Sequence, residues 1–89
     1  MKIVQKSDIA RDILDEAIRA SECYPPFHSA HEGLAIIWEE FEELKREVFK
    51  KQSQYDLALM RKEAIQVGAM ALRFIYDVCD EEATAKEGE

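Results

Sequence analysis

Residues 29–51 read SAHEGLAIIWEEFEELKREVFKK, and this stretch decides the fold. Ser29 followed by Glu32 is a capping box, in which each side chain can satisfy a backbone donor in the first turn of a helix. One side of the helix that follows is apolar and another is acidic, which is typical of an amphipathic helix. The apolar stripe holds Leu34, Ile37, Trp38, Phe41, Leu44 and Val48. We predict a helix from Ser29 to about Lys51, with Trp38 in the core.

A first helix is predicted upstream of this segment. Ser7 can cap it, and apolar residues recur at helical spacing until the helix ends near Tyr24. Pro25 and Pro26 then break the pattern, because neither has a backbone N–H and each restricts the residue before it. The stiff segment from Tyr24 to Phe27 is either the lip of a pocket or a structural turn.

A third helix is predicted downstream, after a polar connection at residues 50–54, and it reaches about Asp80. Between residues 64 and 79 it is apolar on most sides, as expected of a helix that lies between others. Its polar exception is a line of side chains three or four residues apart, interrupted by Met70: Glu63, Gln66, Arg73 and Asp77. Arg73 and Asp77 lie one turn apart, so we expect them to pair with each other. The alternative is that Arg73 contacts a phosphate, if the polar line continues the pocket.

The chain is therefore predicted to be all-α, with three main helices in a single domain spanning residues 1–80. Residues 81–89 are acidic and show no periodicity, so we expect a disordered tail. A chain of 89 residues buries a small core, and a nearly all-apolar third helix needs more cover than two neighbouring helices provide. We therefore expect the helical bundle to be completed by oligomerisation, as a homodimer or homotetramer.

Composition narrows the classes of partner. Hydrophobic residues make up 47% and charged residues 35%, as in ordinary globular proteins, and the formal net charge is −7. An acidic chain is poorly suited to nucleic acid, since binding to phosphates needs a basic face. The sequence has neither an apolar run long enough to span a membrane nor a signal peptide. We expect a cytoplasmic protein that binds neither nucleic acid nor membrane.

Four side chains on the second and third helices suggest chemistry. If these helices pack antiparallel, as their short connection favours, Glu40 and Glu43 can oppose Glu63 and Gln66 across the bundle. Such oxygen ligands suit Mg²⁺ or Mn²⁺, which can hold substrate phosphates and orient an attacking water. Glu39 is then the spare carboxylate that could accept the proton of that water. The alternative is a solvated acidic face, balanced by nearby lysine and arginine.

A family resemblance follows from the same residues. The segment Glu39-Glu40-Phe41-Glu42-Glu43 fits the EExxE motif, so the chain resembles the all-α nucleoside triphosphate pyrophosphohydrolases of the MazG type, relatives of dimeric dUTPases and phosphoribosyl-ATP pyrophosphohydrolases. That family continues with ExxD on the next helix, and the matching stretch here is Glu63-Ala64-Ile65-Gln66. Gln66 stands where an acidic ligand is expected. The resemblance covers residues 30–77.

The resemblance implies a hydrolase acting on acid anhydrides, which converts a ribo- or deoxyribonucleoside triphosphate to the monophosphate and pyrophosphate. It implies Mg²⁺, with Mn²⁺ as a substitute, held by Glu40, Glu43, Glu63 and the Gln66 position. Glutamine is neutral and cannot act as a base. Two other interpretations therefore stay open: a catalytically inactive MazG-like module for nucleotide binding or protein assembly, and an interaction domain without a small-molecule site.

Overall fold

A computed structural model describes residues 3–80 of the chain; the expected acidic tail, residues 81–89, lies outside them. Three α-helices account for most of this part: α1 (Lys6–Cys23), α2 (Ala30–Val48) and α3 (Leu57–Phe74). A 3₁₀ turn, η1 (Gln52–Gln54), lies between α2 and α3, and a π-helical segment, η2 (Ile75–Asp80), continues α3. The described residues contain no strand, so the all-α prediction is confirmed.

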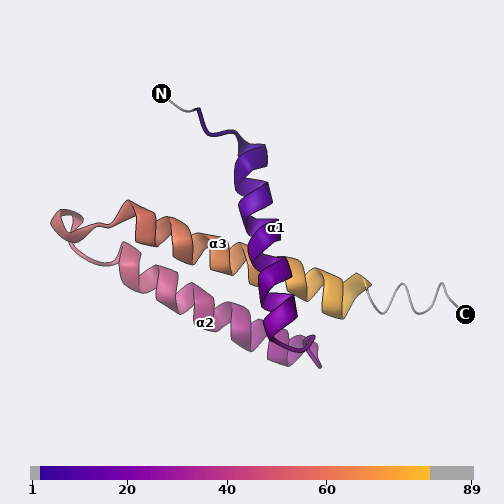
Figure 1. The fold of residues 1–89 in the computed structure, drawn as a ribbon. Coiled ribbons are helices and arrows are strands. Elements are labelled where there is room, and N and C mark those ends of the chain that lie inside the picture. The colour runs from indigo at the N-terminus through magenta and orange to yellow at the C-terminus, as the bar shows by residue number, and fades with distance from the viewer. Residues whose placement is uncertain (1–2, 81–89) are drawn as a thin grey trace, which may run out of the picture.

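The antiparallel arrangement of α2 and α3 is also confirmed. The two helices lie side by side as a long hairpin, and α1 crosses this hairpin at a steep angle (Figure 1). Ser29 caps α2 by accepting a hydrogen bond from the Glu32 N–H at 3.1 Å, which is one half of the predicted capping box. The Glu32 side chain does not complete the box and contacts the His28 ring instead. Asp56 caps α3 in the same way, accepting from the Leu59 N–H at 3.1 Å. These caps determine where both arms of the hairpin begin.

The start of α1 differs slightly from the prediction. The helix begins at Lys6 with Gln5 as its N-cap, and Ser7 lies inside the first turn. Asp8 accepts a hydrogen bond from the Gln5 N–H at 2.9 Å, so an acidic side chain in the first turn satisfies a donor at this end. The other end is as predicted, because the last helical residue, Cys23, comes just before Tyr24 and the two prolines.

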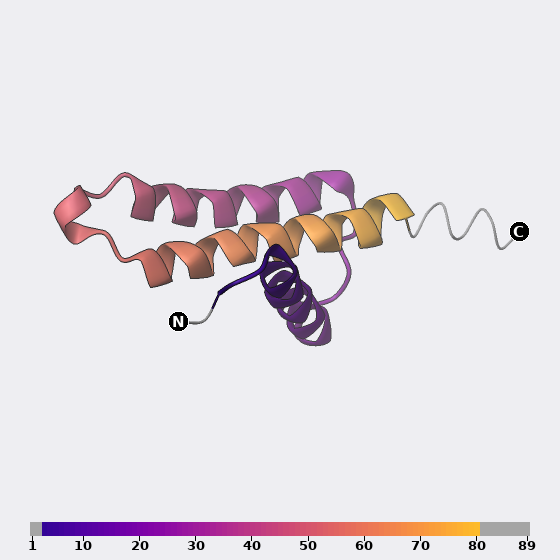
Figure 2. The same cartoon turned by 90° about the horizontal axis from the view of Figure 1, so that it is seen from above.

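α3 is the central helix, because it packs against both α1 and α2. Seen from above, α1 lies on one side of the hairpin and crosses the middle of α3 (Figure 2). The buried apolar residues are few and mostly small: Ala17 and Ala20 of α1, Phe27 of the loop, and Ala69 and Met70 of α3. Small side chains let helix axes approach closely, so the core consists of tight contacts between helices.

The prediction that Trp38 packs in the core is wrong. Its side chain is 61% exposed, and three other members of the α2 stripe, Leu34, Phe41 and Val48, are also exposed. Ile37 alone of that stripe packs against the buried cluster. The reason is topological: α2 has only α3 as a close neighbour, so one narrow side of α2 is covered and the wide apolar stripe is not.

The expected Arg73–Asp77 pair is not formed, since both side chains hold the loop between α1 and α2. The Arg73 guanidinium donates from Nη2 to the Pro25 carbonyl at 2.9 Å and stacks on the Phe27 ring, 4.6 Å from its centroid. Asp77 accepts a hydrogen bond from the Phe27 N–H at 3.1 Å. The loop is therefore fixed to the C-terminal half of the α3 region. Within residues 3–80, no helix is long and apolar enough to cross a membrane.

α2 and α3 are tightly packed at Gly33, where an added Cβ would come 2.5 Å from Cδ2 of Phe74. Phe74 packs against the buried cluster and cannot move freely. We expect Gly33→Ala to lower the free energy of unfolding by about 1–2 kcal/mol, because overpacking outweighs the helical preference of alanine. Chemical denaturation measures this change.

Gly68→Ala is the matched control, since its Cβ would meet the flexible end of Ile13 at 3.1 Å. That substitution should leave the stability unchanged or raise it by up to about 1 kcal/mol. Equal effects of the two substitutions would contradict the packing described for Gly33.

Candidate metal centre

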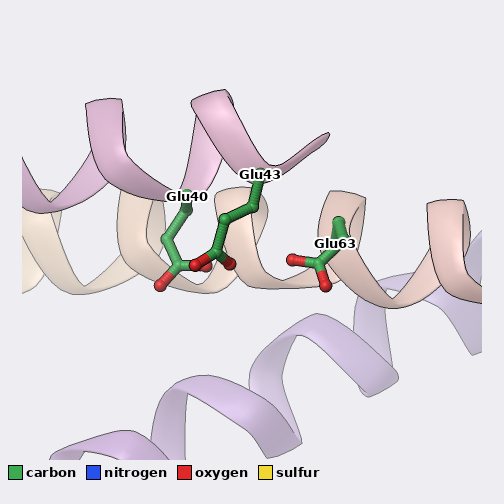
Figure 3. A group of neighbouring side chains, drawn as sticks. All are labelled: Glu40, Glu43 and Glu63. Atoms are coloured by element: carbon green, nitrogen blue, oxygen red, sulfur yellow. The ribbon is translucent and has the colours of Figure 1, made fainter. Parts of the chain in front are cut away.

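Three of the predicted site residues come together in the structure. Glu40 and Glu43 extend from neighbouring turns of α2, and Glu63 extends toward them from α3 (Figure 3). Each offers a carboxylate oxygen, and these oxygens all lie within 4.8 Å of one another. All three side chains are half-buried. The antiparallel hairpin thus places carboxylates that are far apart in sequence around one point.

Glu40 and Glu63 lie in surroundings that disfavour the ionised form of a carboxylate. Burial, followed by the charges of Glu43 and Glu63, raises the pKa of Glu40 from 4.5 to about 7. Burial together with Glu43 also raises the pKa of Glu63. Close to pH 7 Glu40 is therefore only partly ionised, and a positive charge beside it would favour its ionised form. A divalent cation is one such charge, and oxygen-only ligands suit Mg²⁺ or Mn²⁺.

A pocket of about 600 Å³ opens beside the cluster, between the C-terminal half of α1, α2 and α3. Most of the polar line predicted on α3 faces this pocket: Glu63, Gln66 and Arg73 line it together with Met70, whereas Asp77 does not. Its opposite end is formed by the loop after α1, with Tyr24, Pro25 and Phe27 in its wall. The predicted pocket lip is therefore present, and the same segment is also a turn held by α3.

Two other predicted site residues line the same pocket outside the cluster of three carboxylates. Glu39 is exposed to solvent next to Glu40, where it could accept a proton from a water in the pocket. Gln66 is half-buried one turn after Glu63, and its amide Nε2 donates to Glu16 Oε1 at 2.7 Å. The Gln66 amide is thus used to bind α1, where an acidic residue would be repelled by Glu16.

The contribution of α1 was not predicted from the sequence. Glu16 contacts Gln66, and Arg19 lines the pocket next to the buried Ala20. Lys62 of α3 also lines it, so the pocket has basic as well as acidic side chains in its wall. Periodicity alone does not show that Ala17 and Ala20, and therefore the helix face beside Glu16 and Arg19, are buried. The register of α1 on α3 decides which polar residues accompany that face.

No family model, curated protein or solved structure matches the chain. The interpretation of the pocket therefore depends on its own geometry and on the motifs in the sequence.

The raised pKa of Glu40 predicts a pH-dependent stability. Because the folded protein holds this proton more tightly than the unfolded chain, ionisation of Glu40 destabilises the fold as pH rises from 4.5 to about 7. Glu40→Gln removes that cost. In metal-free buffer we expect the variant to be more stable than the native protein by about 1 kcal/mol at pH 8, after allowance for solvent screening, and equally stable at pH 4.

Urea unfolding at both pH values, at one fixed protein concentration, measures this difference. Glu39→Gln, at the exposed neighbouring position, serves as the comparison: the charge of Glu39 makes a smaller contribution to the raised pKa of Glu40, so this variant should give a smaller pH-dependent gain than Glu40→Gln. A gain of equal size at pH 4 and pH 8 for Glu40→Gln would show that charge is not the cause.

Proposed function

We propose that the chain is a Mg²⁺-dependent nucleoside triphosphate pyrophosphohydrolase, which releases pyrophosphate and the monophosphate from a ribo- or deoxyribonucleotide. The observation that carries this proposal is the convergence of Glu40, Glu43 and Glu63 within 4.8 Å at the edge of a pocket. The EExxE motif that supplies Glu40 and Glu43 also supports it. Nucleoside triphosphates are cytoplasmic metabolites, so we place the protein in the cytoplasm.

The side chains present fit a magnesium or manganese ion, since all the donors at the cluster are oxygens and their mutual repulsion is relieved by a cation. Glu40, Glu43 and Glu63 would hold it, with the Gln66 side chain as a fourth candidate ligand. A bound ion supplies charge neutralisation at the phosphates and orients a water. Glu39 is exposed in the wall of the same pocket and is our candidate for accepting the proton of that water.

The dimensions and chemistry of the pocket support a nucleotide. Its volume of about 600 Å³ falls within the range of small-molecule sites. The acidic cluster lies at one end of the wall and the Tyr24–Phe27 lip lies at the other, so a charged ligand end and an aromatic ligand end have separate places. Tyr24 is exposed and can offer a ring face to a base.

One observation favours a second candidate function. Gln66 donates to Glu16, so α1 stabilises a neutral residue at the position where the family motif has an acid. A site with three carboxylates and a neutral fourth position could bind a metal-nucleotide without hydrolysing it. The alternative is therefore a catalytically inactive helical module for nucleotide binding or protein assembly.

Pyrophosphate release from a panel of ribo- and deoxyribonucleoside triphosphates tests the enzyme proposal. With Mg²⁺ or Mn²⁺ we expect turnover that EDTA abolishes. Glu40→Gln should lower kcat/KM by at least about 100-fold, because loss of a metal ligand costs more than the 10- to 100-fold effect of losing a group that only supports a ligand. Glu42→Gln, in the same motif but outside the cluster, should keep native turnover. Native turnover by Glu40→Gln would refute the assignment.

The double variant Glu16→Gln, Gln66→Asp separates the two candidate functions. It introduces the acid of the family motif without setting two carboxylates against each other. Turnover by the double variant alone would identify the native protein as a binding module. Absence of turnover in both proteins, together with no effect of Mn²⁺ on the melting temperature, would favour the interaction domain.

We also propose that a second copy of the chain covers the outer face of α2, defined by Leu34, Trp38, Phe41 and Val48. All four side chains are exposed, and together they form an apolar stripe along the helix. Contiguous exposed apolar surface of this kind is typical of an interface. The same face on two copies can pack against itself about a twofold axis, which gives a homodimer. Two such dimers that meet through a second self-complementary face would give a homotetramer.

Sedimentation or light scattering tests this interface. We expect the native protein to have two or four times the chain mass. Trp38→Glu should halve that mass, to the monomer from a dimer or to the dimer from a tetramer, because a charge in an apolar interface is costly. Trp38→Phe keeps the stripe apolar and should keep the native assembly. A monomeric native protein would rule out the oligomer.

A further inference from the structure

Arg19 of α1 lies in the wall of the pocket, and an ion pair with Glu16 fixes the orientation of its guanidinium. Its Nε donates to Glu16 Oε2 at 2.9 Å, and its Nη2 also contacts the Glu16 carboxylate. A guanidinium has five N–H donors in a planar fork, so contacts through Nε and Nη2 leave the Nη1 side for a ligand. The only described contact at Nη1 is a long one, 4.0 Å, to the Cys23 sulfur. The Arg19 side chain is 57% exposed and open to solvent.

Glu16 is in turn fixed by α3. Its Oε1 accepts from the Gln66 amide at 2.7 Å, and its side chain is only 16% exposed. The Glu16 carboxylate therefore accepts hydrogen bonds from both Arg19 and Gln66. Gln66 lies three residues after Glu63, or about 4.5 Å along the helix axis. The Arg19–Glu16 pair is thereby held about one turn of α3 away from the carboxylate cluster.

Phosphate groups in this pocket need positive charge beyond that of a metal ion. A triphosphate carries several negative charges, and the wall contains Glu39, Glu40, Glu43 and Glu63, which repel it. Three basic side chains line the pocket: Arg19, Lys62 and Arg73. Arg73 is 3% exposed and donates to the Pro25 carbonyl, so its role is to hold the loop. Lys62 is exposed and carries a single ammonium group on a flexible stem. Arg19 has a planar guanidinium that Glu16 already orients, so it is better suited to bind a phosphate.

We propose that Arg19 is a phosphate-contacting residue of this pocket and that Glu16, anchored by Gln66, positions it. The proposal deepens the proposed function and rests on it. It also assigns a use to Gln66 beyond that of a doubtful metal ligand: its amide fixes the carboxylate that orients the arginine. Helix α1, which lies outside the EExxE and ExxD motifs, thereby supplies the anion-recognising part of a site whose cation-binding part comes from α2 and α3.

Inorganic pyrophosphate, titrated calorimetrically in the presence of Mn²⁺, tests Arg19 without assuming any base or any turnover. Mn²⁺ alone is titrated first, so that the metal site is measured separately. We expect Arg19→Gln to leave the affinity for Mn²⁺ within about twofold of native and to weaken pyrophosphate binding by about tenfold or more, since hydrogen bonds to charged groups are strong. Arg19→Lys, which keeps the charge and loses the fork, should recover part of that loss.

Arg61→Gln is the matched control. Arg61 of α3 forms an ion pair with Asp12 of α1, but it does not line the pocket. It should bind pyrophosphate as the native protein does. If Arg19→Gln also binds pyrophosphate with native affinity, the role of Arg19 is refuted while the metal site stands. If the native protein binds no Mn²⁺, or if Glu40→Gln binds it equally well, the proposed function fails and this inference fails with it.

The positioning role of Glu16 has its own readout. Glu16→Gln should weaken pyrophosphate binding less than Arg19→Gln does, because the arginine remains but is less well oriented. In the double variant the loss should equal that of Arg19→Gln alone, since Glu16 acts only through Arg19. Additive losses would show that Glu16 affects binding by another route and would overturn the positioning role.

Discussion

The structure depends on the close approach of α1 and α2 to the two sides of α3. At Gly33 and Gly68 an added Cβ would lie within 3.1 Å of a side chain on the neighbouring helix, and Ala17, Ala20 and Ala69 are among the few buried residues. Because these residues are small, the helices meet at short distance and the longer side chains at the edges converge. The carboxylate cluster and the Glu16–Gln66 contact both lie at such edges.

Electrostatic strain in this small fold is concentrated at one place. Glu40, Glu43 and Glu63 are half-buried beside one another, and the pKa of Glu40 rises to about 7 as a result. Folding stability alone would favour neutral residues there, since burying like charges costs free energy. Glu16 contacts Gln66, one turn of α3 from Glu63, and its pKa is lowered by Arg19 and Gln66. Carboxylates with opposite pKa shifts thus lie close together in the fold, as is typical of sites that bind charged ligands.

The way in which the three helices pack leaves the apolar stripe of α2 exposed. A three-helix arrangement in which α1 packs on α3 leaves α2 with one covered side, so the stripe that includes Trp38 and Phe41 remains exposed. The sequence pattern is amphipathic in the usual sense, but its apolar side and the side packed on α3 are only partly the same. Ile37 lies at their overlap. This mismatch is the physical reason for proposing that another copy of the chain completes the core.

The sequence by itself determined the helices, their order, the break at Pro25 and Pro26, and the polar line of α3, because capping, proline geometry and periodicity act locally. It also predicted that Glu40, Glu43 and Glu63 would meet, since a short connection makes an antiparallel hairpin. Only the tertiary structure decided that Trp38 is exposed, that Arg73 and Asp77 hold the loop, and that Glu16 and Arg19 join the pocket. These outcomes depend on the rotation and crossing point of α1 on α3, which arise from contacts between residues about 50 positions apart and leave no periodic signal in the chain.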